Sequence, residues 1–193
     1  MDRPDTRGAL LDHATRLVRS RGYSAFSYAD LATAVGIRKP SVHHHFPTKE
    51  ELGVALVARY TERFLARLAE IDRLDTGPVD ALERYAALHR EGLVDGEACL
   101  CGVIAAETGA VPAAVAEGVA EFFRVNQAWL TDRIERGQRS GELRPSLDAG
   151  DSAATLLAAL EGAALVARSH NDVAAFDRVA TTSIAVLKGY TPA

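Results

Sequence analysis

Three groups of side chains in this sequence are of types that could do chemistry. A basic pair, Arg38 and Lys39, is followed closely by three consecutive histidines at 43–45. Two cysteines, Cys99 and Cys101, are separated by one residue in an apolar stretch. Single polar residues also interrupt apolar stretches in the second half of the chain. Each group allows both a functional and a purely structural interpretation.

The histidine run is badly spaced for a metal ion. Neighbouring residues on a helix point about 100° apart, so three consecutive imidazoles cannot converge on one ion. We expect His45 to turn towards the core, and His43 and His44 to face outwards. The sequence therefore predicts neither a metal site nor a bound cofactor.

The two cysteines have a reactive and an inert interpretation. Near the N-terminus of a helix, the helix dipole could lower the pKa of one thiol and make it reactive. Cysteine is also among the most buried residue types, and an apolar neighbourhood favours an inert role in the core. On a helix, the sulfurs of Cys99 and Cys101 would face nearly opposite sides, which argues against a disulfide between them.

Composition and motifs exclude several classes of protein. The N-terminus is polar, and no apolar run approaches the roughly 20 residues that span a bilayer, so we expect a cytoplasmic protein with no membrane segment. Two cysteines cannot form a disulfide framework, which agrees with a reducing compartment. The sequence has no G-x-S-x-G, H-E-x-x-H or phosphate-binding glycine loop, so we expect no enzyme activity.

Two short helices joined by a tight turn should position the basic and histidine residues. Ser27 and Asp30 have the S-x-x-D spacing of a capping box that begins the first helix. Gly36 can end that helix in the left-handed conformation, which costs glycine no Cβ clash. The second helix is expected over residues 38–45, with Val42 inward and the basic and polar side chains outward. A short exposed helix of this kind suits the DNA major groove.

A second capping box, from Thr48 to Glu51, should begin the next helix. Lys49 lies in its first turn, where the lysine and the unpaired backbone N–H groups could hold a DNA phosphate. The structural alternative is an exposed lysine without a partner.

The run GIRKPSVHHHFPTKEEL resembles the signature of the TetR-type transcriptional regulators, and the resemblance extends over residues 7–60. It departs at His43, where the family usually has a tyrosine whose hydroxyl meets a phosphate. An imidazole can also donate to a phosphate, with some pH sensitivity. No Ser, Thr, Asp or Asn caps the recognition helix at Arg38 or Lys39. The resemblance implies DNA contacts by Ser27, Tyr28, Arg38, Lys39, Ser41, His43, His44 and Lys49.

The whole chain favours an all-α fold, because apolar residues recur at helical spacing and strand signals are few. The resemblance implies an N-terminal three-helix helix-turn-helix DNA-binding domain at residues 1–48 and a C-terminal helical ligand-binding and dimerisation domain at residues 49–193. Residues 1–50 carry eight basic and five acidic side chains, net +3, and the other 143 residues carry 14 basic and 21 acidic ones, net −7. This polarity suits a nucleic-acid-facing end on an acidic body, although a chance fluctuation of charge would look the same.

The resemblance also implies that the C-terminal domain encloses a ligand pocket between its helices. Polar residues within apolar stretches are the candidate handles, and aromatic residues are the candidate walls. Each alone can equally be a satisfied buried polar group or a rim residue. The candidates are Tyr85, His89, Cys99, Glu107, Phe122, Asn126, Trp129 and Glu161.

Two apolar helical faces near the C-terminus, at residues 149–168 and 172–188, are expected to form a four-helix interface between two copies of the chain. Packing within one monomer is the alternative. The resemblance thus implies a homodimeric, ligand-responsive repressor that leaves a near-palindromic operator in double-stranded DNA when a small-molecule effector binds. The alternative function is a dimeric small-molecule or redox (cysteine) sensor module without DNA binding.

Overall fold

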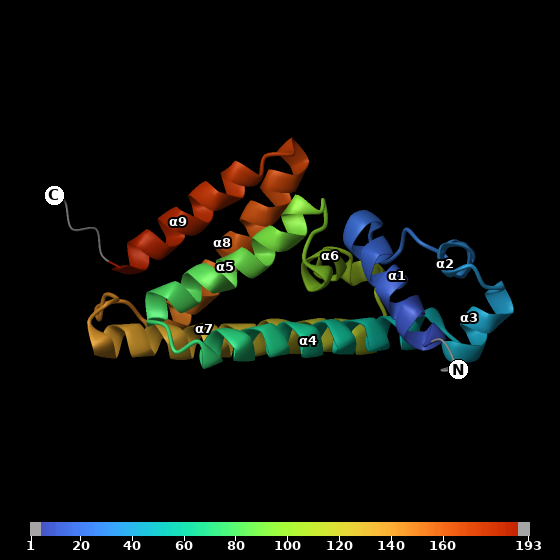
Figure 1. Ribbon diagram of the computed structural model, residues 1–193, viewed down its shortest axis with the longest axis horizontal. Helices are drawn as coiled ribbons and strands as arrows, with labels where there is room; N and C mark the ends of the chain where they lie inside the picture. Colours follow the sequence, from blue (N-terminus) through green and yellow to red (C-terminus); the bar gives the residue numbers. More distant parts are fainter. Residues whose placement is uncertain (1–4, 189–193) are drawn as a thin grey trace. The chain divides into compact units, whose positions relative to one another are not determined.

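The structure, a computed structural model, describes residues 5–188 and is almost entirely helical (Figure 1). Within that range the chain forms nine α-helices, one short 3-10 helix and no β-strand, so the all-α prediction is confirmed. The elements are α1 (Thr6–Arg21), α2 (Tyr28–Val35), α3 (Lys39–His45), α4 (Lys49–Arg73), α5 (Pro78–Val94), α6 (Leu100–Ala105), η1 (Thr108–Ala110), α7 (Ala113–Ser140), α8 (Ala149–His170) and α9 (Val173–Lys188).

The first helices begin and end at the residues that the sequence predicted. The Asp5 carboxylate accepts a 2.8 Å hydrogen bond from the Gly8 N–H, which caps α1. The capping box between Ser27 and Asp30 is present at the start of α2. Gly36 ends α2 with a φ of 74°, a left-handed conformation that is strained for most residues with a Cβ and free of that strain for glycine. These caps fix the angle at which α3 leaves the turn.

Helix α3 is held by packing rather than by a cap. Its N-cap residue Arg38 makes no side-chain capping hydrogen bond, as predicted, and a proline in its first turn supplies a helical φ. Val42 is fully buried and anchors the helix on the core of the N-terminal helices. That core includes Leu10, Leu11, Ala14, Val18, Tyr23, Phe26, Leu31, Leu52 and Leu56, all under 4% exposed.

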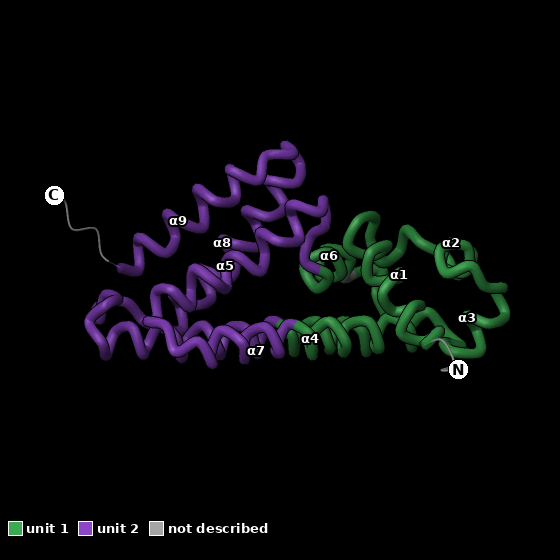
Figure 2. Tube along the Cα trace, viewed as in Figure 1, with its two compact units in different colours: residues 1–63, 100–122 green, residues 64–99, 123–193 purple. Residues whose placement is uncertain are grey.

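The chain divides into two compact units (Figure 2). Unit 1 comprises residues 1–63 and 100–122, and unit 2 comprises residues 64–99 and 123–193. The sequence predicted a single boundary after residue 48. A single cut does not separate the units, because α6 packs against α1 although it is distant in sequence, and because α4 and α7 each contribute residues to both units.

In unit 2, α8 packs against both α9 and α5. Small residues on α8, such as Ala153 and Ala164, are buried in these contacts and permit close approach of the helices. By length and composition alone, α8 is long and apolar enough to cross a membrane, so the expectation that no apolar run approaches that length is wrong. A core helix of a water-soluble protein has the same composition, and the inner face of α8 is packed as such a helix is.

Candidate nucleic-acid interface and buried polar cluster

The outer face of α3 carries the side chains that the sequence assigned to DNA. Arg38, Lys39, Ser41, His43 and His44 are all exposed, and only Val42 between them is buried. The Lys and Arg side chains can reach phosphates, whereas hydroxyl and imidazole groups can hydrogen-bond base edges. The geometry is that of a recognition helix presented by a small packed domain. We call this domain, α1 to α3 with the start of α4, the head.

His43, which departs from the family's usual tyrosine, is positioned by its neighbours. Its ring centroid lies 4.7 Å from that of Tyr28, and Nδ1 lies 3.4 Å from the carbonyl oxygen of Pro47. His45 is only partly buried, with its ring 5.4 Å from that of His44, so the expected turn towards the core is incomplete.

Tyr28, another residue assigned to DNA, is largely buried among the N-terminal helices, and its contact with DNA stays a prediction. The side chain is 7% exposed, and its hydroxyl donates to the carbonyl oxygens of Phe46 at 2.8 Å and Thr48 at 2.6 Å. Burial, with smaller contributions from Tyr23 and Glu51, raises the pKa of this phenol to about 12. Tyr28 therefore fastens the segment that joins α3 to α4.

Two other predicted DNA residues already have internal partners. The Ser27 hydroxyl donates to the Asp30 carboxylate at 2.7 Å and accepts from the Asp30 N–H at 3.3 Å, although Ser27 remains exposed. The Lys49 ammonium donates to the Phe26 carbonyl at 2.7 Å and lies 4.5 Å from the centre of the Phe26 ring. The structure thus contradicts the alternative of a lysine without a partner, and DNA contacts by Ser27 and Lys49 stay predictions.

Glu107, a predicted ligand residue, belongs to unit 1, and its part in ligand binding stays a prediction. Its carboxylate accepts from the N–H groups of Tyr23 at 2.7 Å and Ser24 at 2.8 Å, in the loop between α1 and α2. Burial alone would raise the pKa of this carboxyl, but the hydrogen bonds from Ser24 and Tyr23 and the charge of Lys49 outweigh it and lower the pKa. Glu107 therefore ties the segment after α6 to the head.

Six of the eight predicted ligand residues belong to unit 2, and contacts link them into one cluster. Its centre is a group of three neighbouring rings. The Tyr85 centroid is 5.3 Å from that of His89 and 5.9 Å from that of Phe64, and Phe64 is 6.0 Å from His89. Phe64 was not among the predicted residues. The signal that could have found it is the helical spacing of Tyr60, Phe64 and Leu68, which puts Phe64 on the inner stripe of α4.

Tyr85 is held on two sides. Its hydroxyl donates to Asn126 Oδ1 at 3.0 Å, and both side chains are essentially inaccessible to solvent. Trp129 stacks on the Tyr85 ring with centroids 5.6 Å apart, and the indole N–H donates to Asp72 at 3.0 Å. Two of the predicted residues, Asn126 and Trp129, thus orient a third.

The polar end of the cluster is formed by His89, Glu161 and Cys99. His89 Nδ1 lies 3.9 Å from Glu161 Oε1, and the Cys99 side chain hydrogen-bonds Glu161. Among residues 5–188, His89 Nε2 and Glu161 Oε1 find no hydrogen-bond partner although both atoms are buried. Burial lowers the pKa of His89 to about 4 and raises the pKa of Glu161 despite the hydrogen bond from Cys99. Two buried polar atoms without partners are a costly arrangement for a fold and mark a candidate ligand site.

Phe122, the remaining predicted residue, belongs to the other unit, and its part in ligand binding stays a prediction. It belongs to unit 1, where it is buried and its ring lies 5.5 Å from that of Tyr60. Cys99 and Cys101 are both buried next to the start of α6, which favours the inert interpretation of Cys101.

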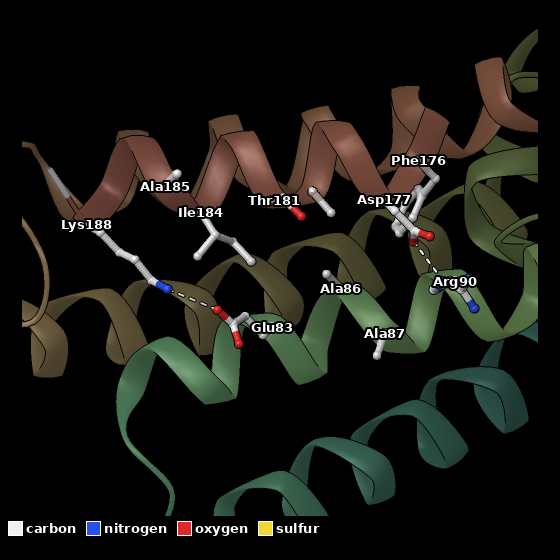
Figure 3. Close-up of a pocket in the computed structure, with 11 residues that line it drawn as sticks. Glu83, Ala86, Ala87, Arg90, Phe176, Asp177, Thr181, Ile184, Ala185 and Lys188 are labelled. Carbon is white, nitrogen blue, oxygen red and sulfur yellow. Dashed lines mark hydrogen bonds and ion pairs between the residues drawn. The ribbon is translucent and has the colours of Figure 1, made fainter. Parts of the chain in front are cut away.

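A separate groove of about 370 Å³ lies between α5 and α9 on unit 2 (Figure 3). Phe176, Ala180 and Ile184 contribute apolar lining from α9. Ion pairs cross the groove at both ends, from Arg90 to Asp177 at 2.8 Å and from Lys188 to Glu83 at 3.1 Å. Phe176, Ala180 and Ile184 belong to the apolar face at 172–188 that was expected between two copies of the chain, and here they are buried beside α5 of the same chain.

The fold and the exposed recognition helix define a helix-turn-helix DNA-binding transcription regulator. The family model for the N-terminal domain of the bacterial regulatory proteins of the tetR family matches residues 10–56, and the model for a tetracyclin repressor-like C-terminal domain matches residues 79–183. The chain belongs to the TetR family, as its sequence resemblance implied.

Relatives match along most of the chain. A TetR-family transcriptional regulator from Agrobacterium tumefaciens, solved by crystallography, is 33% identical with a TM-score of 0.91, covering 95% of this chain and 98% of its own. The HTH-type transcriptional regulator CymR of Pseudomonas putida is 28% identical over 95% of this chain and 90% of its own length. The HTH-type transcriptional repressor DhaR of a Mycobacterium species is 28% identical over 86% of this chain and 83% of its own length.

Proposed function

We propose that the chain acts in the cytoplasm as a homodimeric repressor whose two heads read successive major grooves of a near-palindromic operator. The observation that carries the proposal is the exposed row of basic and hydrogen-bonding side chains on α3, seated on the core by Val42. Two copies of such a helix match successive major grooves when their centres lie about 34–36 Å apart.

Dimerisation through α8 and α9 would bring two heads together. Large apolar side chains stay exposed on both helices: Leu165 and Val166 are 52% exposed on α8, and Val179 and Val186 are 39% and 54% exposed on α9. Such residues on adjacent helices are a natural contact for the same helices of a second copy.

The response to a ligand is assigned to the buried cluster around Tyr85, His89 and Glu161. A ligand that binds one arrangement of unit 2 more tightly than another shifts the balance between DNA-binding and released forms by its difference in affinity. Helix α4 begins directly after the recognition helix and supplies Phe64 to the cluster, so one continuous element belongs to both sites.

The test is selection of bound duplex fragments from the source genome, followed by gel shift of the selected fragments. We expect sites with approximate two-fold symmetry, occupied by two chains. His44→Ala should change which sites are preferred, whereas His170→Ala, which alters an exposed histidine at the end of α8, should not. If neither variant changes which DNA sites are preferred, His44 takes no part in sequence recognition.

A further inference from the structure

We propose that the effector of unit 2 is a small organic cation, a protonated amine on an aromatic or otherwise apolar body, bound by Glu161 and His89 beside the rings of Phe64 and Tyr85. The inference rests on the proposed function and names the chemical class of its ligand.

Both unpartnered atoms at the polar end of the cluster can accept hydrogen bonds. Glu161 Oε1 is a carboxylate oxygen, and no donor among residues 5–188 reaches it. With the proton of the neutral imidazole on Nδ1, the nitrogen 3.9 Å from the Glu161 carboxylate, Nε2 presents a lone pair. His89 is buried, with its side chain 3% exposed, so bulk water does not satisfy that lone pair. Two buried acceptors call for a ligand that donates at least two hydrogen bonds, as an ammonium group does.

The charge of Glu161 also favours a cation. Within the described part of the chain, Glu161 is ion-paired with no lysine or arginine, and its side chain is only 17% exposed. Its closest basic group is His89, which is neutral at pH 7 because burial lowers its pKa to about 4. Arg133, the cation next to the Trp129 ring, is paired instead with Asp132 at 2.8 Å. An incoming cation would supply the missing positive charge, and an incoming anion would be repelled.

The surface beside these acceptors is aromatic. Phe64, Tyr85 and His89 form three mutually neighbouring rings at 5.3–6.0 Å, and Phe64 is partly exposed. Aromatic faces attract cations and also pack against flat apolar groups. Tyr85 cannot turn its hydroxyl to the ligand without giving up its bond to Asn126, so the rings contribute surface rather than further donors.

The inference is tested with three probes of one shape: 4-tert-butylbenzylamine, 4-tert-butylbenzyl alcohol and 4-tert-butylbenzoate. They are titrated into the full-length protein by calorimetry and by fluorescence, because Trp129 is the one tryptophan of the chain and stacks on Tyr85. We expect the amine to bind at least ~10-fold more tightly than the alcohol, and the benzoate to bind most weakly. Equal affinities, tighter binding of the benzoate, or no binding of the amine would overturn the inference.

The matched variants are Glu161→Gln and Glu83→Gln, the latter removing an exposed carboxylate from the α5–α9 groove. Glu161→Gln should weaken amine binding ~10-fold or more and leave the alcohol nearly unchanged, while Glu83→Gln should change neither. A loss in Glu83→Gln alone would mean binding in the outer groove, and an equal loss in both variants would mean that the amine does not depend specifically on Glu161; either result would overturn the inference. Operator binding without probe is measured in parallel, so that a failure of DNA binding is told apart from a failure of the ligand class.

Discussion

The buried imidazole of His89 gives the fold a specific sensitivity to acid. Burial lowers its pKa from 6.5 to about 4 in the folded chain. Between these two values the unfolded chain takes up a proton that the folded chain does not. The free energy of unfolding therefore falls by about 1.4 kcal/mol per pH unit as the pH drops through this window, by about 3 kcal/mol in all. Above pH 6.5 the imidazole is neutral in both states and contributes no pH dependence.

The perturbation that isolates this effect is His89→Phe, which keeps a ring beside Phe64 and Tyr85 but cannot be protonated. Urea unfolding is measured for both proteins at pH 7 and pH 4.5. The wild type should lose about 2–3 kcal/mol more than the variant on acidification. Protonation of Glu161, the titratable neighbour on α8, occurs in both proteins and cancels to first order. An equal loss in both would refute the assignment of a neutral, buried His89, and His170→Phe at an exposed site serves as the control.

Three further predictions concern the head and the dimer. Glu107→Gln should lower the free energy of unfolding by about 1–2 kcal/mol in urea titrations, because it weakens charge-assisted hydrogen bonds to two backbone N–H groups. The control Glu117→Gln, on the exposed side of α7, should change the free energy of unfolding little. Lys39→Ala should weaken binding to all duplexes and reduce the slope of log affinity against log salt by about one, and an unchanged slope would show that Lys39 contacts no phosphate. Leu165→Glu should give monomers in sedimentation experiments, and Val94→Glu, at a residue that is 62% exposed against 52% for Leu165, should not. Dimers in both would exclude Leu165 of α8 from the interface.

The local structure of the head could be predicted from the sequence because its signals are local. Ser27 with Asp30, and Gly36 with its φ of 74°, act within a single turn of chain, so spacing alone fixes where α2 begins and ends. The exposure of α3 followed from one buried position, Val42, in a run of polar residues.

The surroundings of a site residue could not be predicted where they depend on partners distant in sequence. Glu107 lies in an apolar stretch and looked like a pocket residue, but its partners are 83 and 84 positions away in the α1–α2 loop. Tyr28 was expected at the DNA surface because of its place in the motif. Its hydroxyl donates to the carbonyl oxygens of residues 18 and 20 positions later in the chain. Hydropathy could suggest that His89 and Glu161 are buried, but their 3.9 Å separation and their unpartnered atoms depend on how α5 meets α8.

The most direct measurement is the footprint and stoichiometry of the protein on duplex fragments selected from the source genome at low ionic strength. The account predicts two chains per site and two protected half-sites centred about 10–10.5 base pairs, or 34–36 Å, apart, on successive major grooves. Failure to bind any duplex at low ionic strength, or binding unaffected by changes across the outer face of α3, would contradict it.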